Sequence, residues 1–283
     1  SDAATWNMDA AIFVAPPVGK KTYCDYGSDV LLLTRAGVLP ISAILQGVTQ
    51  TAMYEESLSK NISKTLNRIV SSVSFANDWE IWSFPALQSL VITIPENDRG
   101  VSAQYFMNAQ NGAWSEMSMA ATCFGTYKNS YYFGTDDGRV LEYSKDYGRD
   151  NILLDGSGGL PITGTLLSSF SYFGDPTTLK HFKMVRPIFQ SVAEPVSSLA
   201  IAVDYQIGNT AYFDTPVLSE TEIARWDDAL WGNGVWTSSA RIFRPWSSVI
   251  GIGFAGALRM KVTNIAATTA VAWELVYETG GAV

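Results

Sequence analysis

The stretch "SYYFGTDDGRVLEYS", residues 130–144, decides the fold class of this chain. It opens with an aromatic run at 131–133, passes through Asp-Asp-Gly at 136–138, and closes with Val140, Leu141 and Tyr143. Two such runs around a glycine-containing turn are typical of a β-hairpin, because Gly138 supplies the positive φ that a tight turn requires. The stretch therefore predicts two antiparallel strands.

The same pattern recurs through the N-terminal half of the chain. Residues 29–42, "DVLLLTRAGVLPIS", predict a hairpin, and residues 102–117 predict a strand, an Asn-Gly turn and a Trp-bearing strand. "WEIWSF" (79–84) and "SLVITI" (89–94) predict single strands between them. Recurring short strands are typical of β-propeller blades of about 40–50 residues each, although a sandwich also produces them. We expect an all-β fold with incomplete propeller blades over residues 1–158.

One segment of this half has helical rather than strand periodicity. In residues 56–75 the apolar positions recur at spacings of three and four, with Lys60, Lys64 and Arg68 between them. This spacing predicts one inserted amphipathic helix. We expect it to cover a sheet edge or one end of the propeller, and a partner-binding helix is the alternative.

A domain boundary is predicted near "LLDGSGGLP", residues 153–161, because three glycines followed by a proline favour a flexible joint. Strand patterns resume after it at 163–173, 180–189, 198–206, 257–264 and 270–279. In the last of these, Val271, Trp273, Leu275 and Tyr277 alternate with Glu274, Val276 and Glu278. The pattern predicts a β-sandwich domain over residues 159–283.

The number of blades falls short of a closed propeller. Residues 1–155 without the helical insertion provide about two or three blades, whereas closed propellers typically have four to eight. We therefore expect the chain to be the C-terminal part of a longer protein.

Composition limits the function classes. Apolar residues make up 47% and charged residues 16%, which is typical of a globular chain. The chain has 19 basic and 27 acidic residues, a net charge of −8, which argues against a basic nucleic-acid-binding surface. No apolar stretch approaches the roughly 20 residues of a membrane-spanning helix, and residues 1–10 do not resemble a signal peptide. The two cysteines, Cys24 and Cys123, lack metal-ligand spacing; we expect small buried thiols, with a Cys24–Cys123 disulfide as the alternative.

No catalytic constellation is evident. His181 is the single histidine and lies in an expected strand with Lys183 and Val185 on one face, so a structural or exposed role is favoured. No serine lies in a GxSxG motif. "GSGG" at 156–159 precedes a strand rather than a helix, so it does not form a phosphate-binding loop.

The acidic residues favour turns over metal sites. Asp136, Asp137 and Glu142 lack the spacing of an EF-hand loop. A loose Ca²⁺ site from Asp146, Asp150 and Asp155 is the alternative to ordinary turn-forming aspartates. We predict no catalytic residue, no metal and no cofactor.

A glycosidase is the enzyme alternative, because propellers often carry carboxylate-based sugar chemistry. Such an enzyme needs two carboxyl groups about 5–10 Å apart. No sequence feature selects such a pair, and the adjacent Asp227 and Asp228 would point to opposite faces of a strand.

Five stretches in a fixed order resemble a known family. They are "YGSDVLLLTRAGVLPISAILQ" (26–46), "QYFMNAQNGAWSEM" (104–117), "YFGTDDGRVLEY" (132–143), "LLSSFSYFGDPTTLKHFKMVRPIF" (166–189) and "WDDALWGNGVW" (226–236). The chain resembles, over nearly its whole length, the tail hub or nozzle proteins of short-tailed bacteriophages, often described as packaged-DNA stabilisation or head-completion proteins. Such proteins combine β-propellers with an added β-domain, and propeller blades normally precede the region that matches residue 1.

The resemblance implies a non-enzymatic virion protein, made in the host cytoplasm and located in the tail. Its subunits are expected to form a homo-oligomeric ring, a hexamer, below the portal and adaptor and beside other tail proteins. The ring closes the portal channel, retains packaged DNA and passes it during ejection without specific binding. The net charge of −8 agrees with this role, because a basic channel would hold the duplex.

Tryptophans are the candidate interface residues. Trp226, Trp231 and Trp236 recur at intervals of five in "RWDDALWGNGVW", residues 225–236. On a strand, Trp226 and Trp231 would point to opposite faces, and on a helix they would lie about 140° apart, so neither forms a flat sugar platform. We expect a loop whose aromatics anchor in separate surfaces, one of them in a neighbouring subunit. With Trp246 they form the predicted interface set. A carbohydrate-binding or glycosidase propeller, or a generic protein-binding propeller, is the alternative.

Overall fold

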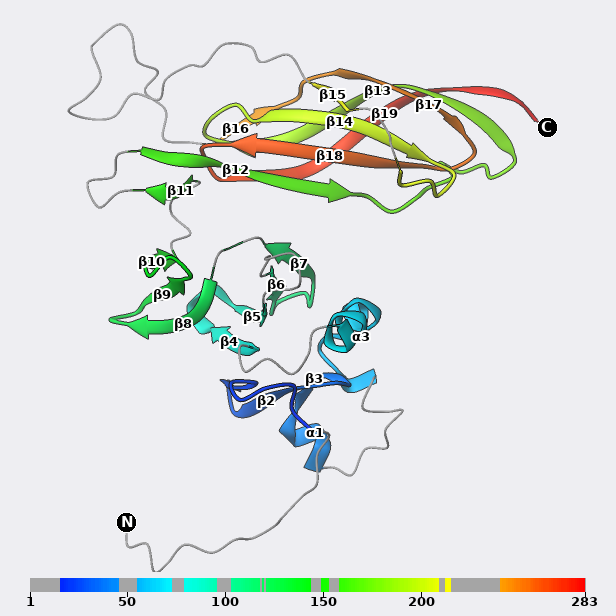
Figure 1. The fold of residues 1–283 in the computed structure, drawn as a ribbon. Coiled ribbons are helices and arrows are strands. Elements are labelled where there is room, and N and C mark those ends of the chain that lie inside the picture. Colours follow the sequence, from blue (N-terminus) through cyan, green and yellow to red (C-terminus); the bar gives the residue numbers. More distant parts are fainter. Residues whose placement is uncertain are drawn as a thin grey trace, which may run out of the picture. The chain divides into compact units, whose positions relative to one another are not determined.

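The computed structural model describes residues 16–45, 55–72, 79–95, 103–117, 119, 121–143, 149–152, 158–208, 212–214 and 240–282. Antiparallel strands make up most of this part of the chain, with a few short helices, and none of its sheets closes into a barrel (Figure 1). The predicted all-β fold class is confirmed at this level.

The chain divides into two compact units, residues 1–144 and 145–283, whereas the sequence predicted a division after residue 158. Residues 158–161 of the stretch that predicted a joint lie in a strand instead, and residues 153–157 lie outside the described part. β11 (Arg149–Ile152) pairs with β12 (Gly158–Leu167), and β12 begins at one of these glycines.

The described part of the N-terminal unit contains three small antiparallel sheets. The first sheet contains β1 (Tyr23–Tyr26), β2 (Asp29–Thr34) and β3 (Gly37–Pro40). The second sheet contains β4 (Glu80–Phe84), β5 (Ser89–Ile94), β6 (Ala103–Asn108) and β7 (Trp114–Met117). The third sheet contains β8 (Ala121–Tyr127), β9 (Ser130–Thr135) and β10 (Val140–Tyr143).

The hairpin at 130–144 is present as predicted. β9 and β10 pair from Gly134 opposite Val140 to Tyr131 opposite Tyr143. Gly138 has a φ of 80° in the turn, and its N–H donates to the Thr135 carbonyl at 3.1 Å. The hairpins predicted at 29–42 and 102–117 are also confirmed, as β2–β3 and β6–β7.

The helical insertion is shorter than predicted. Helix α3 (Ser63–Ser72) follows the 3-10 turn η2 (Lys60–Ile62), and the side chain of Leu66 in α3 is buried. Ser57 and Ser59 are buried and bonded to β3 instead: Ser59 Oγ accepts from the Val38 N–H at 3.1 Å, and Ser57 Oγ donates to the Val38 carbonyl at 3.1 Å. Such side-chain bonds compete with helix formation. The prediction of one continuous helix from residue 56 is therefore wrong, because residues 55–56 are helical but residues 57–59 interrupt the helix. Residues 73–75 lie outside the described part.

Other short helical elements include α1 (Ile41–Leu45) after β3 and η3 (Pro85–Leu87) between β4 and β5. None of the helices that the structure describes has both the length and the apolar character needed to cross a membrane.

Each pair of neighbouring sheets in the N-terminal unit shares its own hydrophobic core. One core joins the first and second sheets through Leu33, Val38, Ile81 and Ile92, with α3 residues packed against it. A second core joins the second and third sheets through the aromatic ring of Phe84, which lies 4.7 Å from that of Tyr131 between centroids. The second sheet is therefore packed between the other two.

Two antiparallel sheets build the C-terminal unit (Figure 1). The five-stranded sheet has the order β11-β12-β18-β14-β15, with β14 (Val196–Val203), β15 (Phe213–Asp214) and β18 (Gly256–Asn264). In the other sheet, the β13 sheet, β13 (Thr178–Ser191) pairs with β16 (Arg241–Phe243) and β17 (Ser247–Gly253) on one edge and with β19 (Thr268–Ala282) on the other.

Both sheets contribute to one core, and two glycines let them approach closely. Phe182 and Val185 of β13 pack with Leu199 and Leu258 of the five-stranded sheet. A Cβ on Gly251 of β17 would lie 2.6 Å from Ile201 of β14, and a Cβ on Gly256 of β18 would lie 2.7 Å from Phe182 of β13. Hence β17 lies over β14 and β13 lies over β18. The alternation predicted for residues 270–279 is confirmed for Trp273, Leu275 and Tyr277, which pack against this core. It is wrong for Val271, which is 58% exposed beside a register shift in the pairing of β13 with β19.

Candidate binding sites

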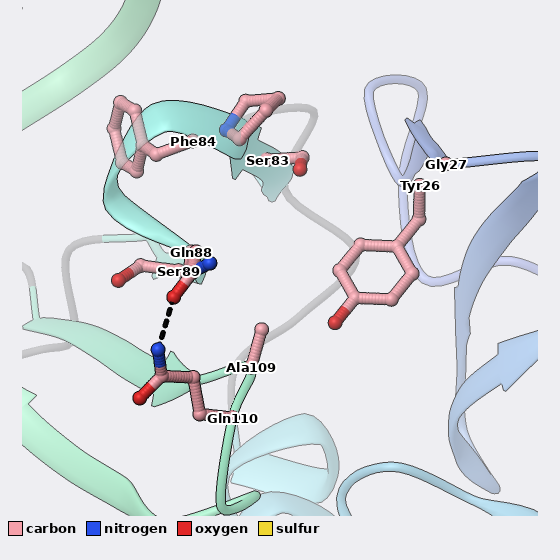
Figure 2. Close-up of a pocket in the computed structure, with 9 residues that line it drawn as sticks. Tyr26, Gly27, Ser83, Phe84, Gln88, Ser89, Ala109 and Gln110 are labelled. Atoms are coloured by element: carbon pink, nitrogen blue, oxygen red, sulfur yellow. Dashed lines mark hydrogen bonds between the residues drawn. The ribbon is translucent and has the colours of Figure 1, made fainter.

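A pocket opens in the N-terminal unit between the β1–β2 turn and one end of the second sheet (Figure 2). Its volume is about 310 Å³, at the lower end of the roughly 300–1,000 Å³ of small-molecule sites. The lining residues are Tyr26, Gly27, Ser83, Phe84, Pro85, Gln88, Ser89, Ala109 and Gln110.

The local backbone places Gln88 at this pocket. Pro85 begins η3, and Gln88 ends it in the left-handed conformation with φ 49° and ψ 45°. Its N–H donates to the Pro85 carbonyl at 3.1 Å, and its own carbonyl accepts from the Ala109 N–H at 2.7 Å. This hydrogen bond joins the η3 turn to the β6–β7 turn. The backbone therefore holds Gln88 and Gln110 next to each other.

The polar groups of the pocket are neutral. Gln110 Nε2 donates to Gln88 Oε1, and Tyr26 extends from the opposite side with its hydroxyl directed toward this pair (Figure 2). The lining residues include no carboxylate, histidine, lysine or arginine. The arrangement suits hydroxyl or amide groups of a neutral ligand, and it provides no group for general acid–base chemistry. Sequence reasoning missed this site, because its three segments are far apart in the chain.

An aromatic depression of about 340 Å³ lies on the third sheet, where Tyr127 and Tyr132 flank Gly125 and Val140. Val140 is 74% exposed, and Lys128 Nζ lies 5.3 Å from the centroid of the Tyr127 ring.

Exposed apolar side chains gather on the outer side of the β13 sheet, which faces away from the shared core. We call this surface the outer apolar face. It consists of Met184, Ile242, Trp246, Ile250, Ile252 and Val276. Ile250 and Ile252 are 67% and 59% exposed. The two isoleucines alternate with Gly251 and Gly253 along β17, and this alternation is the sequence signal that could have identified the face.

Trp246 is the one predicted interface residue within the described part of the chain. Its ring lies 4.6 Å from the Arg186 guanidinium carbon, and Arg186 Nε donates to Glu274 Oε2 at 2.7 Å. The structure therefore combines Trp246 with an ion pair and the outer apolar face. Trp226, Trp231 and Trp236 lie outside the described residues.

His181 lies exposed on the same outer side, beside the ion pair of Lys183 with Glu278. The prediction that His181, Lys183 and Val185 share one face is wrong, because Val185 is fully buried in the core. A register shift between Phe182 and Met184 reverses the alternation of β13 at this point.

The acidic residues of the β9–β10 turn bond locally. Asp137 pairs with Arg139 Nε at 2.7 Å, and the Thr135 hydroxyl bonded to Asp137 is the main reason why the pKa of Asp137 is lowered. Within the described residues, no three His, Cys, Asp or Glu side chains gather as metal ligands. Asp146 and Asp155 of the possible Ca²⁺ loop lie outside that part of the chain.

Both cysteines are free, so the Cys24–Cys123 disulfide is not formed. Burial, with a smaller contribution from Asp25, raises the pKa of the Cys24 thiol to about 12. Cys24 is therefore a packed, protonated thiol, whereas Cys123 is exposed, so the prediction of a buried thiol is wrong for Cys123.

A scan of the chain against protein-family models finds no match, and a search of curated proteins finds no significant match.

Proposed function

We propose that this chain is a non-enzymatic structural protein of a bacteriophage virion. It is one subunit of a ring-shaped tail nozzle or hub that closes the portal channel, retains packaged DNA and passes it during ejection. The proposal starts from the resemblance of five ordered stretches to tail hub and nozzle proteins. The all-β fold in two compact units agrees with such a subunit.

In this proposal, the three small sheets are blades of an incomplete β-propeller and the C-terminal unit is a β-sandwich. Two features support this assignment. The second sheet shares one core with the first and another with the third, as successive blades do. The two sheets of the C-terminal unit share a single core, as in a sandwich.

The outer apolar face is the observation that carries the proposal. Apolar side chains that are exposed together on one side of a sheet commonly mark interaction sites. Tryptophan and arginine are enriched where interfaces are most buried, and Trp246 is stacked on Arg186 here. The face therefore suits contact with a neighbouring subunit of a hexameric ring, with the portal or adaptor, or with another tail protein.

The net charge of −8 supports a channel through which DNA moves. A protein that neutralised many phosphates would bind the duplex tightly through counterion release and would slow ejection. An acidic subunit lacks this attraction, so DNA passes without specific binding.

Electron microscopy tests the proposal directly. The full chain is imaged alone and after mixing with portal and adaptor proteins, and purified virions are probed for the chain. We expect a ring with six-fold symmetry in the tail. A chain that stays monomeric with these partners and is absent from virions would contradict the proposal.

The neutral pocket favours carbohydrate binding as a second candidate function. Tyr26, Gln88 and Gln110 present hydroxyl and amide groups that match sugar hydroxyls, and the lining contains no carboxylate pair for glycoside hydrolysis. A glycan array with wild type and Gln110→Ala tests this candidate. We expect binding that Gln110→Ala abolishes and that Gln190→Ala, a control on the outer side of β13, leaves intact. Absence of binding by the wild type excludes the candidate.

A further inference from the structure

The strand β12 is exposed, apolar and uncharged. Its sequence, Gly-Gly-Leu-Pro-Ile-Thr-Gly-Thr-Leu-Leu, contains no charged side chain. Leu160, Ile162 and Leu166 are 59%, 43% and 48% exposed. β11 pairs with β12 no further than Pro161, and no other described strand pairs with that edge between residues 162 and 167.

The exposed side chains face inward, toward the side of the shared core. Leu166 is opposite Met260 and Gly164 is opposite Val262 in the pairing with β18, and both β18 residues belong to that core. Leu160, Ile162 and Leu166 thus lie on the core side and yet remain exposed.

The strand that faces β12 in the other sheet is also only partly covered. β17 lies over β14 and β13 lies over β18, so the strand order places β19 across from β12. Trp273, Leu275 and Tyr277 of β19 are only partly buried although they pack on the core. An additional strand beside β12 would cover apolar surface from both layers.

Unprotected strand edges attract further strands, and proteins usually block them with charges or prolines. β19 carries Glu274 and Glu278 on its outer side. On β12 the one such residue is Pro161, which lies within the part that β11 covers. The six residues after it have no charge that would oppose pairing.

The sequence of the open edge is self-complementary. Residues 162–166, Ile-Thr-Gly-Thr-Leu, have the same order of chemical types from either end about Gly164. If two copies pair antiparallel about Gly164, Ile162 faces Leu166 and Thr163 faces Thr165. Apolar and Thr–Thr cross-strand pairs both stabilise a sheet. Thr163 already forms such a pair with Thr263 on its other side, with 2.8 Å between the hydroxyl oxygens.

We propose that β12 pairs with β12 of a second copy of this chain across a two-fold axis. The two five-stranded sheets then continue into one another, and Ile162 and Leu166 of the two copies cover each other. The contact is isologous and differs from the head-to-tail contacts of a ring, so it does not rest on the proposed function.

A cysteine at the axis tests the register. Gly164→Cys is made in a Cys123→Ser background, because Cys123 is an exposed thiol. A Cβ on Gly164 meets no atom within 4 Å, so the substitution has room. Opposite Cα atoms in antiparallel strands lie about 4.5–5.5 Å apart, within disulfide range. Mild oxidation should give a covalent dimer, and Val140→Cys, an exposed control in the same background, should not.

A charge at the edge tests the association itself. Leu166→Lys should raise the dimer Kd at least about tenfold, or 1.4 kcal/mol, in sedimentation experiments on the full chain. Val140→Lys is the matched control, and circular dichroism verifies that both variants fold.

Three results would overturn the proposal. One is a wild-type chain that is monomeric at about 100 µM, well above a micromolar Kd. Another is a Gly164→Cys variant that does not cross-link. The third is a Leu166→Lys variant that changes the radius of gyration without changing the mass, because the edge would then be covered by the chain itself. If the chain forms rings but Gly164→Cys does not cross-link, the β12 contact is wrong and the proposed function is unaffected. If the variant cross-links but the chain forms no ring with portal and adaptor, the proposed function is wrong and the β12 contact is unaffected.

Discussion

The carboxylate of Glu80 in β4 accepts a hydrogen bond from the backbone N–H of Phe124 in β8, with 3.1 Å between Oε2 and N. Glu80 is 5% exposed, so this bond places a buried acid between the second and third sheets. Burial raises the pKa of Glu80 above its ordinary value of 4.5, while the charge of Lys21 and the Phe124 N–H oppose part of this shift.

Glu80→Gln should remove a pH-dependent part of the stability. Since the folded-state pKa of Glu80 is raised, the folded chain binds more protons than the unfolded chain just above pH 4.5. The free energy of unfolding therefore falls as the pH rises through this window. The stabilising contribution of protonated Glu80 is fully present only below the window. Each unit of pKa elevation corresponds to about 1.4 kcal/mol. Glutamine stays neutral and keeps an acceptor for Phe124.

Urea unfolding of wild type and Glu80→Gln across this pH range measures the effect. We expect the variant to gain stability relative to wild type as the pH rises, whereas Glu142→Gln, an exposed control on β10, shows no such gain. A difference that is the same at all pH values would show that burial does not raise this pKa.

Gly37→Ala should destabilise the N-terminal unit strongly. Gly37 has a φ of 121°, and a Cβ there would lie 2.5 Å from Ser57 Oγ and even closer to Ser59 Oγ. We expect the free energy of unfolding to fall by more than about 2 kcal/mol, because backbone strain and a buried steric clash add. Gly112→Ala is the control: its φ is 67° but a Cβ meets nothing within 4 Å, so about 1 kcal/mol is expected. Equal losses in the two variants would mean that the serines move aside easily.

Lys180→Met should destabilise the C-terminal unit. The Lys180 side chain is 1% exposed, and its ammonium group donates to the carbonyls of Asp175, Thr178 and Phe254. Methionine fills similar space but leaves these carbonyls without their donor, which should cost about 2–4 kcal/mol in denaturant unfolding. Lys183→Met removes an exposed ion pair with Glu278 and should cost less than about 1 kcal/mol. If the two substitutions have the same effect, the three carbonyls find other donors.

Trp246→Ala should weaken assembly without unfolding the chain. Trp246 is 38% exposed and stacks on Arg186, so its removal takes an aromatic anchor from the outer apolar face. We expect the concentration needed for half-maximal ring formation to rise at least about tenfold, the size of an interface hot spot of 1.4 kcal/mol or more. Trp246→Phe should have a smaller effect. Mass photometry measures ring formation, and unchanged assembly in Trp246→Ala would remove this face from the ring contacts.

Trp231→Ala should likewise weaken ring assembly or docking of the C-terminal unit, as the sequence predicts. Assembly by mass photometry and thermal unfolding separate the two effects. If neither changes, residues 225–236 serve neither purpose.

Local signals predicted much of the fold. The β9–β10 and β6–β7 hairpins depend on neighbouring residues and on the positive φ of Gly138 and Gly112, so the sequence identifies them directly. Interactions between distant segments were not predictable in this way. The predicted helix is interrupted at residues 57–59 because Ser57 and Ser59 bond to Val38, about twenty positions earlier. β17 was overlooked, since its glycines weaken the strand pattern.

The candidate sites show the same limit. Trp246 could be singled out because tryptophans are enriched at interfaces, whereas its contact with Arg186 depends on how segments distant in the chain come together. The neutral pocket joins turns near Tyr26, Gln88 and Gln110, which no motif connects. The role of Trp246 in a contact stays a prediction.

The two glycines between the layers of the C-terminal unit also constrain its evolution. Gly256 faces the ring of Phe182 and Gly251 faces Ile201, each with no space for a methyl group. A lineage that acquires alanine at residue 256 must therefore carry a smaller side chain at residue 182, and alanine at 251 requires a smaller side chain at 201. Among descendants of this sequence, these two pairs of positions should change together.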